Sequence, residues 1–219
     1  MWALKGDITE PQLGLDAKPS IAITLSREAF AHLADACTVM TDDVVTAPSN
    51  LPHWTVGHVL THIARNAEGH TLRLRAALDG FDVARYPGGS DQRNREIADG
   101  AARRARDIVD DVLSTQAQLE SVWSQHVAAD WPHPHMLGAD TWPITESPAR
   151  RLREIEMHHV DLGLGYLQTQ WSKEYVDWDL SNLLETLAHR IGSSDRPAVL
   201  SWLAGRGPQP HRLELGPWI

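Results

Sequence analysis

Before residue 175 the sequence contains no convincing run of alternating apolar and polar residues, which argues against a β-sheet in the larger part of the chain. Apolar side chains instead recur every three or four residues in several stretches, as they do along one face of an amphipathic helix. The first three stretches cover residues 26–46, 55–79 and 91–126, and a fourth begins at residue 147. Four helices of such length predict a helical bundle whose interior is lined from several helices.

Start and stop signals frame these predicted helices. Thr55 can cap the second helix at its start, and Gly80 marks its end. Gly100 is expected to bend or break the third helix. Ser147 and Pro148 suit the N-cap and the first position of the fourth helix. The fourth helix therefore begins where a proline-rich loop ends.

The two ends of the chain differ from this helical middle. Residues 1–24 have no helical pattern, and we expect a loosely ordered leader there. Residues 175–219 carry two shorter helical patterns, at 180–191 and 198–205, and an alternating segment at 211–215 that predicts a strand. The expected organisation is therefore a leader, a helical bundle over residues 25–168 and a small C-terminal α+β unit over residues 175–219.

Charge and cysteine content narrow the kinds of partner. The formal net charge is −9 and no block is rich in Lys or Arg, which argues against nucleic acid or an anionic membrane as the partner. No segment reaches the roughly 18 apolar residues of a membrane-spanning helix. Cys37 is the only cysteine, so an internal disulfide cannot form, and a reducing cytoplasm is the simplest compartment. A small molecule is the ligand that these properties favour.

The fourth predicted helix carries an unusual set of polar residues in the stretch "RLREIEMHHVDLGLGY". Glu154 and His158 are four residues apart and share one face of the helix, which Asp161 continues. Glu156 and His159 point elsewhere on the helical wheel. A carboxylate and an imidazole at this spacing can reach one metal ion, but they can equally form a plain hydrogen bond. On this pair alone, the hydrogen bond is the simpler interpretation.

The second predicted helix offers further ligand candidates in "TVGHVLTHIARNAEGH". His58 and His62 are four residues apart, and Asn66 lies one turn further along the same face. His62 falls among apolar residues, where an inward imidazole needs a partner. Together with Glu154 and His158 it would complete a His₂Glu set, which leaves coordination positions open as catalytic zinc sites do. His58 competes for this role, but a capping or surface position near the helix start suits it better.

These two segments, "HWTVGHVLTHIARNA" and "RLREIEMHHVDLGLGY", resemble the signature segments of the mycothiol-dependent maleylpyruvate isomerase family. That family belongs to the DinB-like metal-binding four-helix bundles, and the resemblance covers roughly residues 25–168. It implies a mainly α fold and a metal ion, with zinc favoured, held by His62, Glu154 and His158. The helical wheel had narrowed the choice of ligands, and the resemblance decides it.

The resemblance also implies the chemistry. Family members use the low-molecular-weight thiol mycothiol, and a thiol bound to zinc is deprotonated at neutral pH. Reversible addition of this thiolate to the cis double bond of maleylpyruvate would permit rotation and return the trans isomer. The thiol and a small anionic substrate are then the partners. Cys37 lies on the apolar stripe of the first helix, where we expect a buried structural thiol.

A dianionic substrate needs a cationic anchor, and arginine is the best suited. In the family an "AGRG" segment of the C-terminal domain supplies it, so the "LAGRG" segment of this chain points to Arg206. Arg65, Arg73, Arg151 and Arg153 are other possible anchors, and we expect most of them to be surface charges.

The C-terminal unit of this chain is shorter than the usual C-terminal domain of the family. A mycothiol-dependent S-transferase acting on another electrophile and a non-catalytic metal-sensing or thiol-sensing bundle therefore remain as alternatives.

Overall fold

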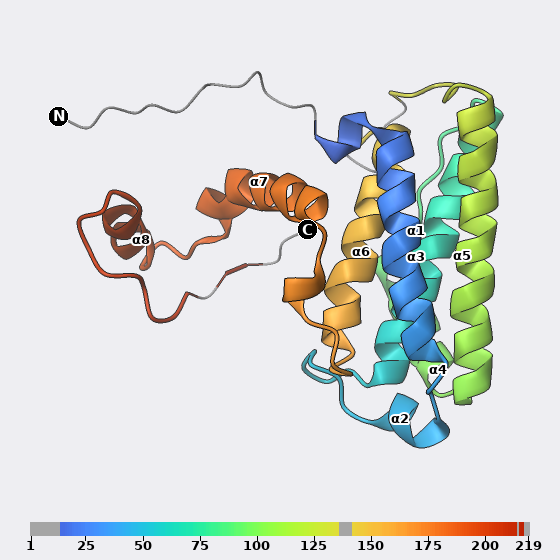
Figure 1. Cartoon of the computed structure of the whole chain (residues 1–219), viewed down its shortest axis with the longest axis horizontal. Helices are drawn as coiled ribbons and strands as arrows, with labels where there is room; N and C mark the ends of the chain where they lie inside the picture. Colours follow the sequence, from blue (N-terminus) through green and yellow to red (C-terminus); the bar gives the residue numbers. More distant parts are fainter. Residues whose placement is uncertain (1–13, 136–141, 214, 217–219) are drawn as a thin grey trace. The chain divides into compact units, whose positions relative to one another are not determined.

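Four long helices lie side by side and form the body of the first of two units into which the chain divides (Figure 1). In this computed structural model, which describes residues 14–135, 142–213 and 215–216, these helices are α1 (Pro19–Cys37), α3 (Val56–Leu78), α5 (Ala105–Ala128) and α6 (Ser147–Asp161). The units are Met1–Tyr175 and Val176–Ile219. The mainly α bundle predicted from the spacing of apolar residues is confirmed.

The first predicted helix is in fact two helices. Helix α1 starts at Pro19, ahead of the expected start at residue 26, because Pro19 supplies the fixed φ of a first turn. It ends at Cys37, and the short helix α2 (Asp42–Thr46) follows. The Thr41 hydroxyl accepts a hydrogen bond from the amide of Val44 at 3.3 Å and caps α2. Residues 1–13 of the expected leader lie outside the described residues.

Helix α3 begins where its capping signal predicts. The Thr55 hydroxyl accepts a hydrogen bond from the amide of His58 at 3.3 Å. In return, Nδ1 of His58 accepts one from the amide of Thr55, also at 3.3 Å. This reciprocal pair has the form of a capping box, with histidine in the place usually held by glutamate or glutamine. The capping interpretation of His58 is therefore confirmed.

The third predicted helix is interrupted near Gly100, as expected. Helix α4 (Gly89–Ala101) ends one residue later, and α5 starts at Ala105. Gly100 also permits a close approach between helices, because a Cβ at this position would come within 2.4 Å of Cγ2 of Thr61 on α3. Packing against α3, as well as conformational freedom, therefore favours glycine here.

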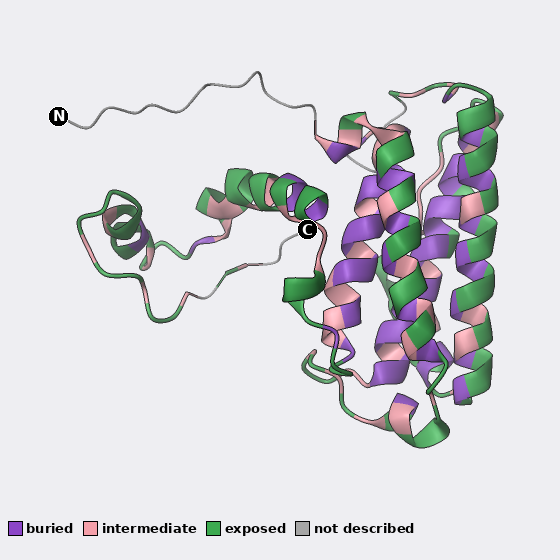
Figure 2. Ribbon diagram, viewed as in Figure 1, coloured by how far each residue is buried: buried purple, intermediate pink, exposed green. Residues whose placement is uncertain are grey.

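Buried residues line the facing sides of the bundle helices (Figure 2). Helix α3 packs against α4, α5 and α6, and α1 packs against α6. One fully enclosed cluster contains Leu74, Leu119, Val122 and Trp123. Among the described residues, no helix is both long enough and apolar enough to cross a membrane. Helices α3 and α6, which carry the candidate ligands, are thus held in direct contact inside the first unit.

The second unit contains fewer regular elements. Helix α7 (Lys173–Arg190) begins in the first unit and continues through the second, and α8 (Arg196–Leu203) follows. The strand expected at residues 211–215 is not formed in the described part of that segment, where Leu215 makes one isolated antiparallel bridge with Ile191. A single bridge leaves the alternating pattern without a sheet to join.

Candidate metal centre

Three candidate ligands meet between α3 and α6. Nε2 of His62 lies 2.9 Å from Oε2 of Glu154, and Nε2 of His158 lies 3.4 Å from the same oxygen. One donor atom from each residue falls within 4.8 Å of the other two. The side chains are nearly enclosed, with exposed fractions of 5% for His62, 13% for Glu154 and 12% for His158.

The spacing of these atoms fits a metal ion. Ligand atoms of a tetrahedral zinc site, each about 2.1 Å from the ion, are separated by about 3.4 Å. The separations of 2.9 and 3.4 Å from Oε2 of Glu154 are already close to this value. Two imidazoles and one carboxylate leave at least one coordination position open, as in catalytic sites. The three residues could therefore hold a divalent transition metal with little movement.

Without a metal, burial and mutual hydrogen bonds set the pKa values of the three candidate ligands. Burial alone would raise the pKa of Glu154, but hydrogen bonds from His158 and His62 hold it well below its usual range. Burial would lower the pKa of His158, but hydrogen bonds to Asp161 and Glu154 outweigh this effect and raise it to about 9. For His62 burial dominates and lowers the pKa to about 4, although Glu154 opposes it. Without a metal, His158 is therefore protonated at neutral pH.

The two histidines have different outer partners. Nδ1 of His158 is 2.8 Å from Oδ2 of Asp161, the carboxylate–histidine arrangement that orients metal-binding imidazoles in many sites. Nδ1 of His62 instead accepts a hydrogen bond from Nη2 of Arg93 on α4, at 2.9 Å. Asp161 was visible on the helical wheel as a continuation of the Glu154 and His158 face. Arg93 was missed, because it lies outside both signature segments and no spacing connects it with them.

Neighbouring polar residues of α6 face away from this centre, as predicted. The hydroxyl of Tyr166 donates to Oε2 of Glu156 at 2.6 Å, and the ring of His159 stacks on that of Tyr166 with centroids 3.8 Å apart. His58 caps α3 and is not part of the candidate cluster.

The expectation that most of the other arginines are surface charges is wrong. Arg151, Arg73 and Arg153 are 0%, 1% and 8% exposed, respectively. Arg151 donates to the side chains of Gln116 and Asn66 and to the carbonyl of Ile63, at 3.1, 2.8 and 2.9 Å. It therefore lies inside the bundle, where its Nε and Nη1 donate to polar atoms of α3 and α5.

Arg65 and Arg206 occupy different settings. Arg65 is half-buried and forms ion pairs with Asp111 and Glu68, at 2.6 and 3.0 Å. Arg206 lies in the second unit, in the turn after α8, where it is exposed and donates to the carbonyl oxygens of Ala204 and Gly205 at 3.4 and 3.5 Å. Its assignment as the substrate anchor stays a prediction.

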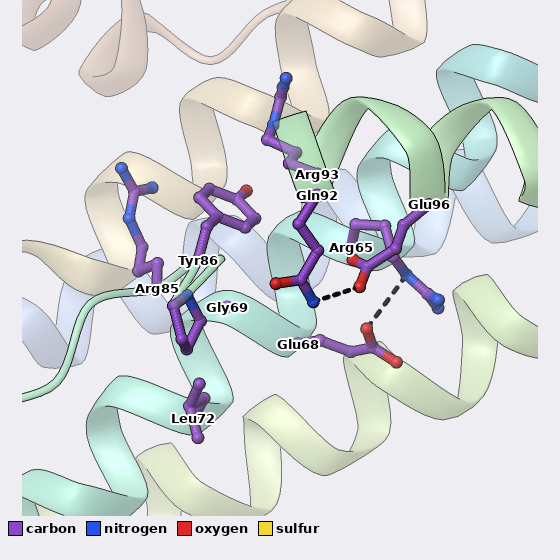
Figure 3. Close-up of a pocket in the computed structure, with 10 residues that line it drawn as sticks. Arg65, Glu68, Gly69, Leu72, Arg85, Tyr86, Gln92, Arg93 and Glu96 are labelled. Carbon is purple, nitrogen blue, oxygen red and sulfur yellow. Dashed lines mark hydrogen bonds and ion pairs between the residues drawn. The ribbon is translucent and has the colours of Figure 1, made fainter. Parts of the chain in front are cut away.

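A pocket with a volume of about 180 Å³ opens between α3, α4 and the loop before α4 (Figure 3). Glu68 and Glu96 line it together with Arg65, Tyr86 and Arg93. In Figure 3 the guanidinium of Arg93 extends past the ring of Tyr86, away from the two glutamates. The pocket therefore contains both acidic and basic groups. The guanidinium of Arg93, however, is directed at His62.

Comparison with known proteins agrees with this architecture. The family described as "Mycothiol maleylpyruvate isomerase N-terminal domain" matches residues 26–163. A solved structure of a mycothiol-dependent maleylpyruvate isomerase superposes with a TM-score of 0.71 and 22% identity over 78% of this chain and 72% of the other. A histidine-to-alanine variant of that isomerase gives a TM-score of 0.72 and 22% identity over 80% and 73% of the two chains. No curated protein sequence matches this chain.

Proposed function

The chain belongs to the mycothiol maleylpyruvate isomerase N-terminal domain family, and on this basis we propose that it is a mycothiol-dependent, zinc-assisted cis–trans isomerase. Its substrate would be maleylpyruvate or a similar cis-enoic oxo-acid. The observation that carries the proposal is the convergence of His62, Glu154 and His158 on one point between α3 and α6.

The residues of the chain would act mainly by positioning. His62, Glu154 and His158 would hold the ion, and Asp161 would fix the ring of His158 through Nδ1. The bound ion would supply charge that favours the deprotonated form of a thiol. The thiolate sulfur would add to the cis double bond while the electron pair moves into the conjugated oxo-acid. Rotation about the resulting single bond and loss of the thiolate would then give the trans isomer.

The thiol must come from outside the chain. Cys37 is buried on α1, and burial raises the pKa of its thiol to about 11, so it stays protonated at neutral pH. It also lies on a different helix from each candidate ligand. We therefore expect Cys37→Ala to keep most of the activity, and loss of turnover with intact fold and metal content would count against an external thiol.

We further propose that Arg206 stabilises the negative charge that develops on the substrate. The support is the match of "LAGRG" with the family segment, together with the ability of a guanidinium to bind carboxylate or enolate oxygens. Arg206→Ala should then lower turnover by roughly a hundredfold to a thousandfold, the cost of losing one such donor in other enzymes. Turnover close to that of the parent protein would remove Arg206 from the mechanism.

The decisive experiment is conversion of maleylpyruvate by zinc-loaded protein with and without mycothiol. We expect isomerisation only when both zinc and the thiol are present. His62→Ala should abolish it, whereas the matched variant His58→Ala changes a capping histidine one turn away and should retain it. Conjugation of mycothiol to other electrophiles without isomerisation would assign the S-transferase alternative instead.

A further inference from the structure

Arg93 is a cation at the edge of the candidate metal centre, and the described residues include no acidic partner for it. Its Nη2 donates to Nδ1 of His62 at 2.9 Å, and its Nη1 donates to Oδ1 of Asn94 at 3.3 Å. Its guanidinium carbon lies 5.6 Å from the centre of the Tyr86 ring. Within the described part of the chain, no carboxylate forms an ion pair or hydrogen bond with it. The charge of Arg93 is therefore held next to the centre without being neutralised.

Two other arginines near α3 and α4, Arg65 and Arg103, are neutralised by acidic partners. Asp111 pairs with both Arg65 and Arg103, at 2.6 and 2.5 Å, and Glu68 adds a second acidic partner to Arg65. The contrast shows that acidic groups are available on these helices, but none is directed at Arg93. A guanidinium left in this state is suited to an anion supplied by a ligand.

The contact between Arg93 and His62 cannot persist in the same form when a metal is bound. An imidazole that binds a metal through Nε2 keeps its hydrogen on Nδ1, and that nitrogen then donates instead of accepting. Arg93 also has only donors. Two donors cannot share a hydrogen bond, so Nη2 of Arg93 would lose its contact with His62 and become available to an anion beside the ion.

We propose that Arg93 is a carboxylate-binding residue of the metal centre, which holds one carboxylate of an anionic ligand on the side of Arg93 that adjoins His62. The inference rests on the proposed function and adds a specificity-determining residue to it. The pocket of about 180 Å³ is less suited to an anion, because Glu68 and Glu96 line it beside its arginines, and Arg65 there is already paired with Glu68 and Asp111. The guanidinium also extends away from both glutamates (Figure 3). Arg93, a residue of the bundle unit itself, thus selects ligands that carry a carboxylate.

The test uses zinc-loaded protein and succinate, a dicarboxylate without a double bond to which a thiol could add. Calorimetric titration should show binding to the parent protein and a loss of affinity of roughly tenfold to a hundredfold in Arg93→Gln, the worth of hydrogen bonds to a charged group. Arg93→Lys keeps the charge but not the planar donor pair, so its affinity should be intermediate. Arg95→Gln changes an exposed arginine of the same helix and should bind succinate as the parent does.

A zinc titration of the same variants separates carboxylate binding from a structural role. Because Arg93 places positive charge beside His62, Arg93→Gln should bind zinc at least as tightly as the parent protein. If zinc affinity and succinate affinity fall together, Arg93 only supports the ligands and the proposal is overturned. Equal succinate affinity in the parent and Arg93→Gln would overturn it as well. Neither titration needs mycothiol or turnover, so failure of isomerisation alone would contradict the proposed function and leave this result intact.

Discussion

His62 and His70 lie two turns apart on the same inward face of α3, yet their surroundings differ. Each is nearly inaccessible to solvent, and burial lowers the pKa of each imidazole. Nε2 of His62 meets the carboxylate of Glu154 at 2.9 Å. Nδ1 of His70 meets the hydroxyl of Ser147 at 2.8 Å, and its ring stacks on Trp142 with centroids 5.5 Å apart. Equal burial therefore accompanies two different kinds of polar contact.

The difference comes from what α6 presents at each level of α3. Glu154 lies opposite His62, Arg151 lies opposite Asn66, and Ser147 lies opposite His70. The hydroxyl of Ser147 can form a hydrogen bond with one ring nitrogen, but it carries no negative charge that would attract a cation. The carboxylate of Glu154 carries such a charge, and the imidazole of His158 lies nearby. An inward histidine in a bundle thus indicates a metal site only when a facing helix supplies the rest of the ligands.

The largest effect on stability should come from replacing Arg151, which lies opposite Asn66, between His62 and His70. Arg151→Met would leave the oxygens of Gln116, Asn66 and Ile63 without their buried donor. We expect the free energy of unfolding to fall by about 3 kcal/mol, because the lost bonds are to a charged group and the acceptors stay buried. Urea denaturation measures this.

Arg95→Met, at an exposed position of α4, is the matched control and should change stability by less than about 0.5 kcal/mol. A similarly small change in the free energy of unfolding of Arg151→Met would mean that the buried hydrogen bonds of Arg151 contribute little to stability.

The next largest effect should come from Asp161, the carboxylate partner of His158. Asp161→Asn removes the carboxylate 2.8 Å from Nδ1 of His158 while keeping the size of the side chain. Zinc affinity should fall by about tenfold to a hundredfold, the usual cost of losing such an outer partner. A competition titration against a chelator measures the change, with Asp110→Asn on the exposed face of α5 as the control. Unchanged zinc affinity in Asp161→Asn would argue against His158 as a ligand.

The smallest effect, taken per pH unit, is a pH dependence that His70 cannot produce. The pKa of His158 is raised from 6.5 to about 9, so its proton stabilises the metal-free protein below pH 6.5 and this contribution is lost as the pH rises to about 9. Zinc must displace that proton, so zinc affinity should rise about tenfold per pH unit between roughly pH 7 and 9. Chelator competition at several pH values tests this. A flat profile in the parent protein would contradict a protonated His158, and Asp161→Asn should flatten the profile.

The features of the site that follow from helical periodicity could be predicted from the sequence. Spacing of four residues placed Glu154 and His158 on one face, and the apolar neighbours of His62 directed it inward. The capping signal at Thr55 predicted the start of α3 because it is a local hydrogen-bonding pattern. Such features depend on a single helix and can be worked out from a helical wheel.

Features that depend on a second helix could not be predicted in the same way. Arg151 has the charge of a surface residue, and only the polar atoms of α3 and α5 explain its burial. The contact of Arg93 with His62 joins residues 31 positions apart on different helices. The break between α1 and α2 was hidden by apolar spacing that continues on both sides of it. Helix packing, rather than local propensity, decides these cases.

The central claim is that His62, Glu154 and His158 form a metal site, and metal analysis of the purified protein tests it most directly. We expect one zinc per chain in the parent protein and in His70→Ala, because His70 meets only a hydroxyl. The double variant His62→Ala, His158→Ala should contain no zinc while keeping its helical circular dichroism. Full zinc occupancy in this double variant would contradict the claim.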